Sequence, residues 1–390
     1  MGYQDSVFNQ ILKVIPGYQL DRLIDKYMGD FRVRTLGCRE QFLAMLFGQL
    51  TGRNSLRDVV DNFNANHQHF YHLGCRGEIR KSTLADANKR RPVEIYQDLF
   101  EELAAKALTG KKRSETTQLV SLIDATTIVL NQTRFGWAKG HSGKSGIKIH
   151  TVYDLDARIP TYFEVTTARS SDLSSAKTMT YEAGRTYVYD RGYYDFQLWA
   201  NIDASGSWFV TRLKKNSPTK VISKCEIPAG ESHILSDNEV MLNQRLARSR
   251  QNPYHKTLRE VTVQVEAKKD PIRLITNDME SSAKDIAGLY KKRWQIELFF
   301  KWIKQNLKIK AFLGTSENAL KIQVLVAMIA YLLLRLLNKN PFCQNTSILK
   351  MTRLVATNLM RRISLLELFG PPPDKPSKGK IKPQRSLSFA

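Results

Sequence analysis

LVSLIDATTIVL, residues 119–130, is the stretch that decides the fold, because its β-branched and apolar residues run without glycine or proline and predict a strand. Similar patterned segments follow it: GIKIHTVYDLDA (146–157), IPTYFEVTTA (159–168), DLSSAKTMTYEA (172–183), RTYVYD (185–190), FQLWANIDAS (196–205) and SWFVTRLKK (207–215). The third and fifth of these are predicted helices and the others are predicted strands. The order β-β-β-α-β-α-β predicts a mixed α/β domain.

The chain before this domain is predicted to be helical. From residue 8 to about residue 108, apolar residues recur at intervals of three and four, and Ser55 and Ser82 are predicted N-caps. Glycine, charged and small polar residues replace this periodicity in GKKRSETTQ (110–118), which predicts a domain boundary. Residues 1–110 are therefore interpreted as an all-helical amino-terminal domain.

One short stretch of that domain carries a run of positive charge. KSTLADANKRR (81–91) ends in Lys89, Arg90 and Arg91. It fits a DNA-reading helix in a helix-turn-helix-like bundle, which would place all three cations on DNA. A solvated basic turn explains the same charge run equally well.

The second half of the chain is predicted to hold four further segments. Polar, interrupted sequence with short alternating pieces predicts a β-rich insertion at about residues 214–270, and PIRLITND (271–278) predicts a strand. This strand leads into the longest predicted helix, residues 282–307. Residues 336–369 are predicted to be a helical carboxy-terminal region, and the Pro-, Lys- and Ser-rich tail at 370–390 to be disordered.

The formal net charge of +23, from 60 Lys and Arg against 37 Asp and Glu, implies a polyanionic partner. Nucleic acid is the leading interpretation, although an anionic membrane surface or ribosomal RNA would fit the charge alone. The most hydrophobic segment, residues 322–337, is shorter than the roughly 20 residues that a bilayer needs and contains Arg335. It is predicted to be a buried core helix, so no membrane partner is expected.

The cysteines argue for a reducing compartment. The four lie far apart without a CxxC pair, which counts against a disulfide framework and a zinc ribbon and favours the cytoplasm, where a DNA-binding protein would associate with the nucleoid. The amino terminus has no basic and apolar signal segment. His67, His69, His72 and Cys75 have metal-binding chemistry but no recognised zinc-site spacing, and surface or packing roles are favoured for them.

Two aspartates are candidates for a shared site. Asp124 lies inside an apolar predicted strand, where an unpaired charge is costly to bury, and Asp190 ends another such strand. In α/β sheets functional side chains gather at the carboxyl ends of strands. A single aspartate in either setting is more often a helix cap or turn former, but two in matching settings favour a common function.

The long predicted helix offers a third carboxylate. Tyr290, Arg293, Glu297, Lys301 and Lys304 are spaced by three, four, four and three residues and therefore form one polar stripe. An ordinary amphipathic helix with i,i+4 ion pairs would explain the charges but not the tyrosine. Phosphodiester chemistry needs two divalent cations about 3.5 to 4 Å apart, and converging carboxylates hold such a pair.

These motifs together resemble a known family. YKKRWQIELFFKWIK (290–304) matches Tyr-x2-Arg-x3-Glu-x6-Lys, the YREK signature of the insertion-sequence-four family of bacterial DDE transposases. IDAT around Asp124 and YDRGYYD around Asp190 resemble the two aspartate regions of that family. The resemblance covers roughly residues 115–335, and the helical amino-terminal part resembles the leader domain of one branch of the family.

The resemblance implies a function and a fold. It implies a DNA transposase that cleaves at transposon ends and transfers the strand into target DNA, on a ribonuclease-H-like core interrupted by the β-rich insertion. Asp124, Asp190 and Glu297 would form the catalytic, metal-binding triad, with Mg²⁺ as the expected ion and Mn²⁺ as its substitute. Tyr290, Arg293 and Lys304 would contact phosphates, roles that suit an Arg fork and a Lys point charge. Terminal inverted repeats, target DNA and a second copy in a homodimeric synapse are the implied partners.

Several residues outside that signature are further candidates for DNA contact or for packing. Lys301 and Arg212 are predicted DNA contacts, although a salt-bridged surface Arg is as good an interpretation for Arg212. His150 is predicted to pack within its strand. Three tryptophans could stack on a flipped base, but core burial is favoured for most of them; they are Trp208, Trp294 and Trp302. The alternative functions are a nuclease or resolvase without strand transfer and a non-catalytic DNA-binding regulator.

Overall fold

The structure is a computed structural model that describes residues 5–109, 119–140, 144–227, 231–243, 252–265, 270–306, 312–343 and 346–370. The predicted domain boundary at residues 110–118 and the predicted tail from residue 371 onward lie outside the described residues.

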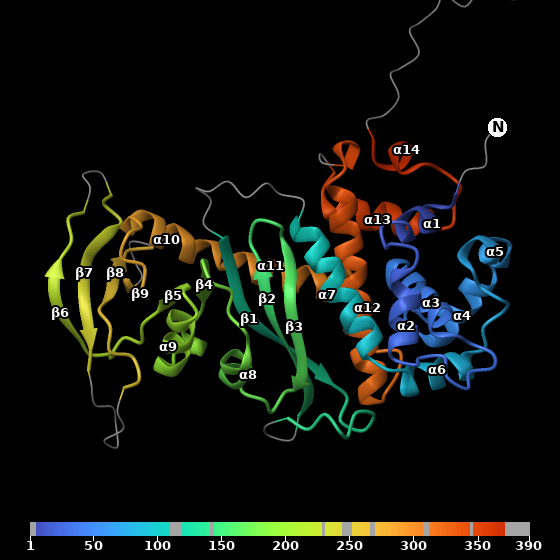
Figure 1. The fold of residues 1–390 in the computed structure, drawn as a ribbon, viewed down its shortest axis with the longest axis horizontal. Coiled ribbons are helices and arrows are strands. Elements are labelled where there is room, and N and C mark those ends of the chain that lie inside the picture. The colour runs from blue at the N-terminus through green and yellow to red at the C-terminus, as the bar shows by residue number, and fades with distance from the viewer. Residues whose placement is uncertain are drawn as a thin grey trace, which may run out of the picture.

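One mixed sheet runs through the described part of the chain, with the strand order β3-β2-β1-β4-β5-β9-β8-β7-β6 (Figure 1). Its strands are β1 (Leu119–Leu130), β2 (Ser145–Asp154), β3 (Ile159–Thr167), β4 (Arg185–Tyr189), β5 (Trp208–Arg212), β6 (Thr219–Lys224), β7 (Ile234–Leu242), β8 (Leu258–Val263) and β9 (Ile272–Thr276). The first three strands form an antiparallel meander, and β4 and β5 continue the sheet parallel to β1. The predicted mixed α/β class is confirmed.

Helices lie before, between and after the strands. Their bounds are α1 (Val7–Leu12), α2 (Gln19–Lys26), α3 (Cys38–Leu50), α4 (Leu56–Asn64), α5 (Phe70–Leu73), α6 (Lys81–Arg90), α7 (Glu94–Thr109), α8 (Asp172–Thr178), α9 (Phe196–Ala204), α10 (Ala283–Lys292), α11 (Trp294–Asn306), α12 (Glu317–Asn338), α13 (Ile348–Asn358) and α14 (Leu365–Phe369). The Ser55 hydroxyl caps α4, as predicted. The prediction for Ser82 was wrong, because α6 begins at Lys81 and its N-cap is Arg80.

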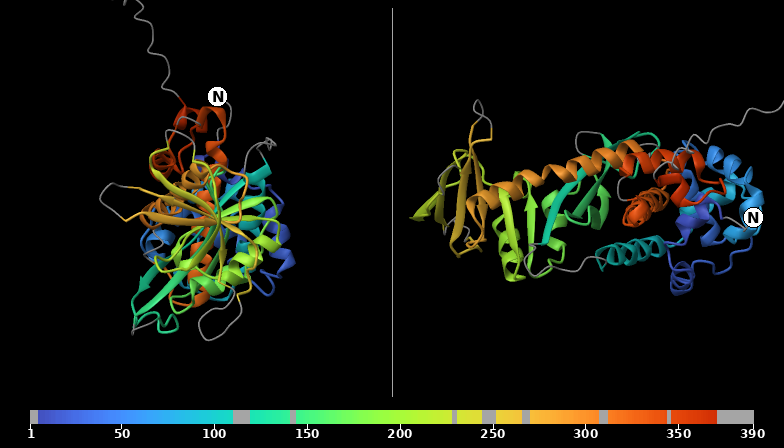
Figure 2. Two further views of the ribbon diagram at one scale, coloured as in Figure 1. Left: turned by 90° about the vertical axis from the view of Figure 1, so that its left-hand side faces the viewer. Right: turned by 90° about the horizontal axis from the view of Figure 1, so that it is seen from above.

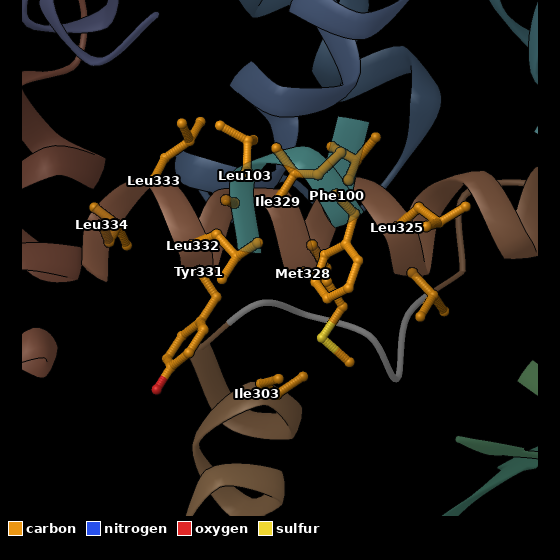
Figure 3. Close-up of a cluster of buried hydrophobic side chains, with 14 of the residues drawn as sticks. Phe100, Leu103, Ile303, Leu325, Met328, Ile329, Tyr331, Leu332, Leu333 and Leu334 are labelled. Atoms are coloured by element: carbon orange, nitrogen blue, oxygen red, sulfur yellow. The ribbon is translucent and has the colours of Figure 1, made fainter. Parts of the chain in front are cut away.

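Helix α12 is the centre of the core. It packs against α3, α6 and α7, which precede the sheet in the chain, and also against β3 and α13. In Figure 3 its side chains meet Phe100 and Leu103 of α7 on one side and Ile303 of α11 on another (Figure 3). By length and composition α12 could cross a membrane, but 83% of its apolar window is buried inside the protein. The predicted core helix at 322–337 is therefore confirmed.

The long helix predicted at 282–307 is observed as two helices that meet at Arg293. The backbone N–H of Arg293 donates to the carbonyl of Tyr290, three residues back, so the regular i to i−4 pattern is interrupted there. In Figure 2 α10 and α11 nevertheless follow each other as one rod along the sheet (Figure 2). Helix α10 packs on β5, β8 and β9, and α11 packs on β1. Because α11 packs on β1, an inner strand of the sheet, the polar residues of α11, among them Glu297, lie over that strand.

Candidate active site

Asp124 and Asp190 lie at adjacent positions of neighbouring strands. The last residues paired in the parallel β1–β4 ladder are Ile123 and Tyr189. Asp124 and Asp190 follow these two residues directly, one within β1 and one just beyond the end of β4. Parallel pairing therefore brings together two carboxylates that are far apart in the sequence.

Glu297 lies in the first turn of α11, above the same region of β1. A cleft of about 380 Å³ opens between β1 and α11 and is lined by Asp124 and Glu297. The other residues that line it are Ala125, Thr126, Phe300, Lys301, Lys304 and Gln305. Two of the three predicted carboxylates, Asp124 and Glu297, thus line one cleft together with two of the predicted cations, and Asp190 follows the strand next to Asp124.

The electrostatic setting of Asp124 reflects this crowding. Burial is the largest effect on its carboxyl and raises its pKa to about 6. The backbone N–H of Ala125 donates to Oδ1 of Asp124 at 2.8 Å and opposes the rise. The negative charges of Asp190 and Glu297 raise the pKa further, and the Arg293 guanidinium lowers it. A bound cation would favour the charged carboxylate, because it would offset both the burial and the repulsion.

The three carboxylates do not converge on a single point in this arrangement. Glu297 Oε1 accepts an ion-paired bond from Arg293 Nη2 at 2.7 Å, and Asp190 Oδ1 accepts from the backbone N–H of Gly192 at 2.7 Å. Within the described residues, no group of three or more His, Cys, Asp or Glu side chains stands in metal-binding geometry. In this arrangement Glu297 and Asp190 are each held by a different partner.

The cations predicted from the helix stripe surround the cleft. Lys304 Nζ donates to the carbonyl oxygen of Thr127 on β1 at 3.1 Å, whereas Lys301 is exposed to solvent. The Arg293 guanidinium lies 5.9 Å from the centre of the Tyr290 ring. Arg212, at the end of β5, is close enough to lower the pKa of the Tyr290 hydroxyl, which burial raises.

The predicted basic cluster of α6 is divided by the structure. Lys89 and Arg90 are exposed in the last turn of the helix. The guanidinium of Arg91 instead donates to two backbone carbonyls, of Gly29 at 2.9 Å and of Leu36 at 2.6 Å. The structure therefore shows a scaffolding role for Arg91 that the sequence did not suggest.

The lone histidine and the tryptophans are mostly packed. His150 is 1% exposed, and its Nε2 lies 2.8 Å from the Thr166 hydroxyl, which confirms the predicted packing role. Trp302 packs edge-on against Tyr331, and Trp208 is half-buried in β5. Trp294 is 57% exposed at the start of α11. His69 is buried, and the described histidines and cysteines of its neighbourhood form no metal cluster.

Tyr193 is a site residue that sequence reasoning missed. It is 2% exposed, and burial raises the pKa of its hydroxyl, with Asp124, Asp172 and Asp190 raising it further. Among the described residues its hydroxyl has no hydrogen-bond partner. The only sequence signal was its place in YDRGYYD, three positions after Asp190.

A mixed sheet with a carboxylate cleft, on a chain of net charge +23, is typical of enzymes that break and form bonds in nucleic-acid backbones. Comparison with known proteins gives the family. A family model described as a transposase DDE domain matches residues 115–333, more than half of the chain, and a model described as a domain of unknown function matches residues 3–76. The chain belongs to the DDE transposase family and is a DNA transposase. Enzymes with this domain generally use divalent metal ions.

The relatives carry the same designation. A Sinorhizobium fredii protein named as transposase y4zB is 40% identical over 314 residues, which cover 79% of this chain and 85% of the relative. A Geobacillus stearothermophilus protein named as a transposase for insertion sequence element IS5377 is 29% identical over 65% of this chain and 66% of its own length. The solved piggyBac transposase synaptic complex with hairpin DNA matches with a TM-score of 0.40 and 15% identity, over 91% of this chain and 78% of that chain.

Proposed function

We propose that this transposase cleaves the ends of its own element and joins the freed 3'-hydroxyl to target DNA, with Asp124, Asp190 and Glu297 as its catalytic residues. The observation that carries the proposal is the adjacency of Asp124 and Asp190 on paired parallel strands, together with the cleft that Asp124 and Glu297 line. The strand order β3-β2-β1-β4-β5 supports a ribonuclease-H-like core.

The donor set fits a hard divalent cation. Carboxylate oxygens are the ligands that Mg²⁺ prefers. Asp124 and Glu297 line one cleft, and the negative charges of Asp190 and Glu297 both raise the pKa of Asp124. Mg²⁺ is the proposed ion, and Mn²⁺, which prefers similar ligands, is its proposed substitute. When bound, such ions would activate the attacking hydroxyl and stabilise charge on the transferring phosphate.

The surrounding cations are proposed to bind the DNA backbone. Lys301 and Lys304 line the cleft, Arg293 is ion-paired to Glu297 beside it, and Tyr290 and Arg212 lie near Arg293. Forked guanidinium groups, ammonium point charges and a hydroxyl together form a set suited to phosphate. Arg293 has a further role in this proposal. A phosphate that took over its guanidinium would release Glu297, so DNA binding and completion of the metal site would be coupled.

The remaining parts of the proposal concern organisation. The chain is assigned to the insertion-sequence-four family with its YREK signature, and residues 1–110 and 115–335 are its amino-terminal DNA-binding and catalytic domains. The insertion at 214–270 contains β6, β7 and β8, and the carboxy-terminal helical region is 336–369. Lys89 and Arg90 are proposed DNA contacts, with Arg91 beside them. A homodimer holding two terminal inverted repeats, associated with the nucleoid in the cytoplasm, is the proposed working form.

The test is end cleavage by variants that remove one carboxylate at a time. We expect Asp190→Asn and Glu297→Gln each to slow Mg²⁺-dependent cleavage by more than about 100-fold, since losing even a supporting partner of a ligand costs roughly 10- to 100-fold. Glu317→Gln is the matched control, because this exposed glutamate is also in the first turn of a helix with an i,i+4 partner, Lys321.

Two outcomes would refute parts of the proposal. Near-normal cleavage by either carboxylate variant, at a fixed salt concentration and with unchanged DNA binding, would remove that residue from the triad. Hydrolysis products without any strand-transfer product, on an oligonucleotide substrate with Mg²⁺, would favour the nuclease alternative.

A further inference from the structure

The segment between α2 and α3, residues 27–37, forms a second groove with helix α6. The groove has a volume of about 480 Å³ and belongs to the helical part of the molecule, away from the cleft between β1 and α11 (Figure 1). The side chains that give it its character are Met28, Phe31, Arg32, Arg34, Asp86 and Arg90.

The groove combines exposed apolar and cationic side chains. Met28 is 70% exposed and Phe31 is 67% exposed, which is unusual for large apolar residues in a folded chain. The guanidinium carbon of Arg32 lies 5.1 Å from the centre of the Phe31 ring, so a cation is stacked on the aromatic face. Arg34 and Arg90 are exposed as well, and Asp86 is the one carboxylate among the lining residues, all of which are described.

The segment is fixed in place by contacts at both ends. Arg91 donates to the carbonyls of Gly29 and Leu36, which lie near the beginning and the end of the segment. Asp30 Oδ1 accepts from the backbone N–H of Cys38 at 2.7 Å. A Cβ at Gly29 would stand 2.6 Å from Ile95 Cδ1, so the backbone is packed tightly against α7. The exposed side chains are therefore displayed on an ordered support, which lowers the entropic cost of binding.

We infer that this groove binds duplex DNA, with Arg32, Arg34 and Arg90 on phosphates and Phe31 against the sugars and base edges between them. Four arginines line the groove against one carboxylate, and the three that are not bound to backbone carbonyls, Arg32, Arg34 and Arg90, complement a polyanion. Apolar side chains flanked by arginine are used to enter or stack on nucleic acid. A second copy of this chain is a poor occupant, because the chain carries a net charge of +23 and the groove adds to the repulsion.

The inference deepens the proposed function, since it rests on DNA being the substrate, but it does not depend on the catalytic triad. It also explains how the hydrogen bonds of Arg91 to Gly29 and Leu36 would contribute to DNA binding. Arg91 holds the segment that carries Arg32 and Arg34 beside Arg90, so the basic cluster of α6 acts partly through its neighbours.

The experiment measures binding of the full chain to a fluorescein-labelled random-sequence duplex by anisotropy, in EDTA and over a series of NaCl concentrations. For the double variant Arg34→Gln and Arg90→Gln we expect the slope of log K against log[NaCl] to fall in magnitude by about 2, because each lost phosphate contact reduces it by about 1. The control removes the same charge elsewhere, with Arg353→Gln and Arg361→Gln on and just after α13, which lies at the top of Figure 1 whereas α6 lies at the bottom.

A second variant tests the aromatic contact separately. Phe31→Ala should weaken binding at least about fivefold at every salt concentration and leave the salt slope unchanged, because stacking involves no counterion release. Since the Phe31 side chain is exposed, the urea unfolding midpoint of the Phe31→Ala variant should match that of the unaltered chain.

The outcomes separate this inference from the catalytic proposal. Equal slopes for the groove variant and the α13 control would overturn the inference. So would a change in sedimentation behaviour without a change in DNA affinity, which would make the groove a self-association surface. Because no divalent cation is present and the varied residues line a groove away from the cleft between β1 and α11, the expected changes in slope and affinity hold whether or not the catalytic assignment is correct.

Discussion

The charged form of the buried Asp124 carboxylate, which metal binding would need, lowers the free energy of unfolding of the chain. Its carboxyl has a pKa of about 6 in the folded chain against an ordinary value of 3.8. Between these pH values the folded chain holds a proton that the unfolded chain has lost. The contribution of this group to stability is therefore greatest below pH 3.8, falls as the pH rises through this window, and is smallest above pH 6.

This linkage predicts that Asp124→Asn stabilises the chain while abolishing cleavage. In EDTA at pH 8 the variant should have a free energy of unfolding higher by up to about 3 kcal/mol, and at pH 4 the difference should largely disappear. Urea unfolding at the two pH values measures both. A variant no more stable than the unaltered chain at pH 8 would show that burial does not penalise this carboxylate.

Tyr193 provides a second prediction at the residue scale. Its buried hydroxyl lies in the field of Asp124 and Asp190, so Tyr193→Phe should lower the metal-dependent cleavage rate by roughly tenfold, the lower end for a group supporting metal ligands. Stability should change by less than about 1 kcal/mol, because the hydroxyl has no described hydrogen-bond partner to lose.

Tyr189→Phe is the matched control for that prediction. Tyr189 is also fully buried with an unpartnered hydroxyl among the described residues. Burial raises the pKa of this hydroxyl most, and the ionisable neighbours that add to the rise are Tyr181, Asp195 and Tyr254, not the aspartates of the cleft. Equal cleavage by the two phenylalanine variants would deny Tyr193 any role at the cleft.

Sequence reasoning reached the two aspartates because their signal is local. Each stands at the end of, or within, an apolar run, and parallel pairing places such positions together. The roles of Arg91 and Tyr193 had no such signal. The carbonyl partners of Arg91 lie 62 and 55 positions away, and Tyr193 is set apart from other tyrosines only by the carboxylates that the fold brings to it.

At the scale of elements, the sequence predicts the strands but not which strands pair with each other. Alternation within 259–268 and 271–278 predicts strands, but it does not reveal that β9 pairs with β5 and carries β8, β7 and β6 as an extension of the same sheet. Edge pairing is a non-local property, since it depends on which unpaired strand edge is available when the elements meet. The break between α10 and α11 at Arg293 was also invisible, because the helical periodicity continues across it.

The segment between α2 and α3 gives a prediction at this scale. Arg91→Gln should lower the free energy of unfolding by about 2 kcal/mol or more, because it leaves the buried carbonyls of Gly29 and Leu36 without a charged donor. Arg90→Gln, one residue earlier and exposed, should change it by less than about 0.5 kcal/mol. Urea unfolding compares the two, and equal midpoints would show that the two bonds of Arg91 do not stabilise the segment.

At the scale of the whole molecule, α12 joins parts that the sequence suggests are separate. Helices α3, α6 and α7 pack around it, and so do β3 and α13. The helical amino-terminal part therefore takes a large share of its core from a helix that follows the strands of the sheet in the chain. A core shared in this way favours cooperative unfolding of the helical part and the sheet.

This sharing predicts how fragments behave. Residues 1–109 expressed alone should lack a sharp urea transition, since they leave the binding face for α12 exposed, whereas the same residues joined by a linker to 312–370 should recover one. Circular dichroism during urea unfolding distinguishes the cases. A cooperative transition from residues 1–109 alone, with a midpoint equal to that of the fusion, would establish the amino-terminal part as an independent folding unit.

The hydrogen bonds that hold α1 join residues that are made far apart in time during biosynthesis. The backbone N–H groups of Val7 and Phe8 donate to the carbonyls of Arg361 and Leu359, and the Gln10 side chain bonds to Ile363 and Leu365. A ribosome therefore releases the first helix long before it has made the residues that receive it. Helix α1 can meet Phe47 and α12 before then, but its backbone partners are missing until residues 359–365 have been made, so a product that stops before residue 359 leaves the first turn of α1 without these hydrogen bonds.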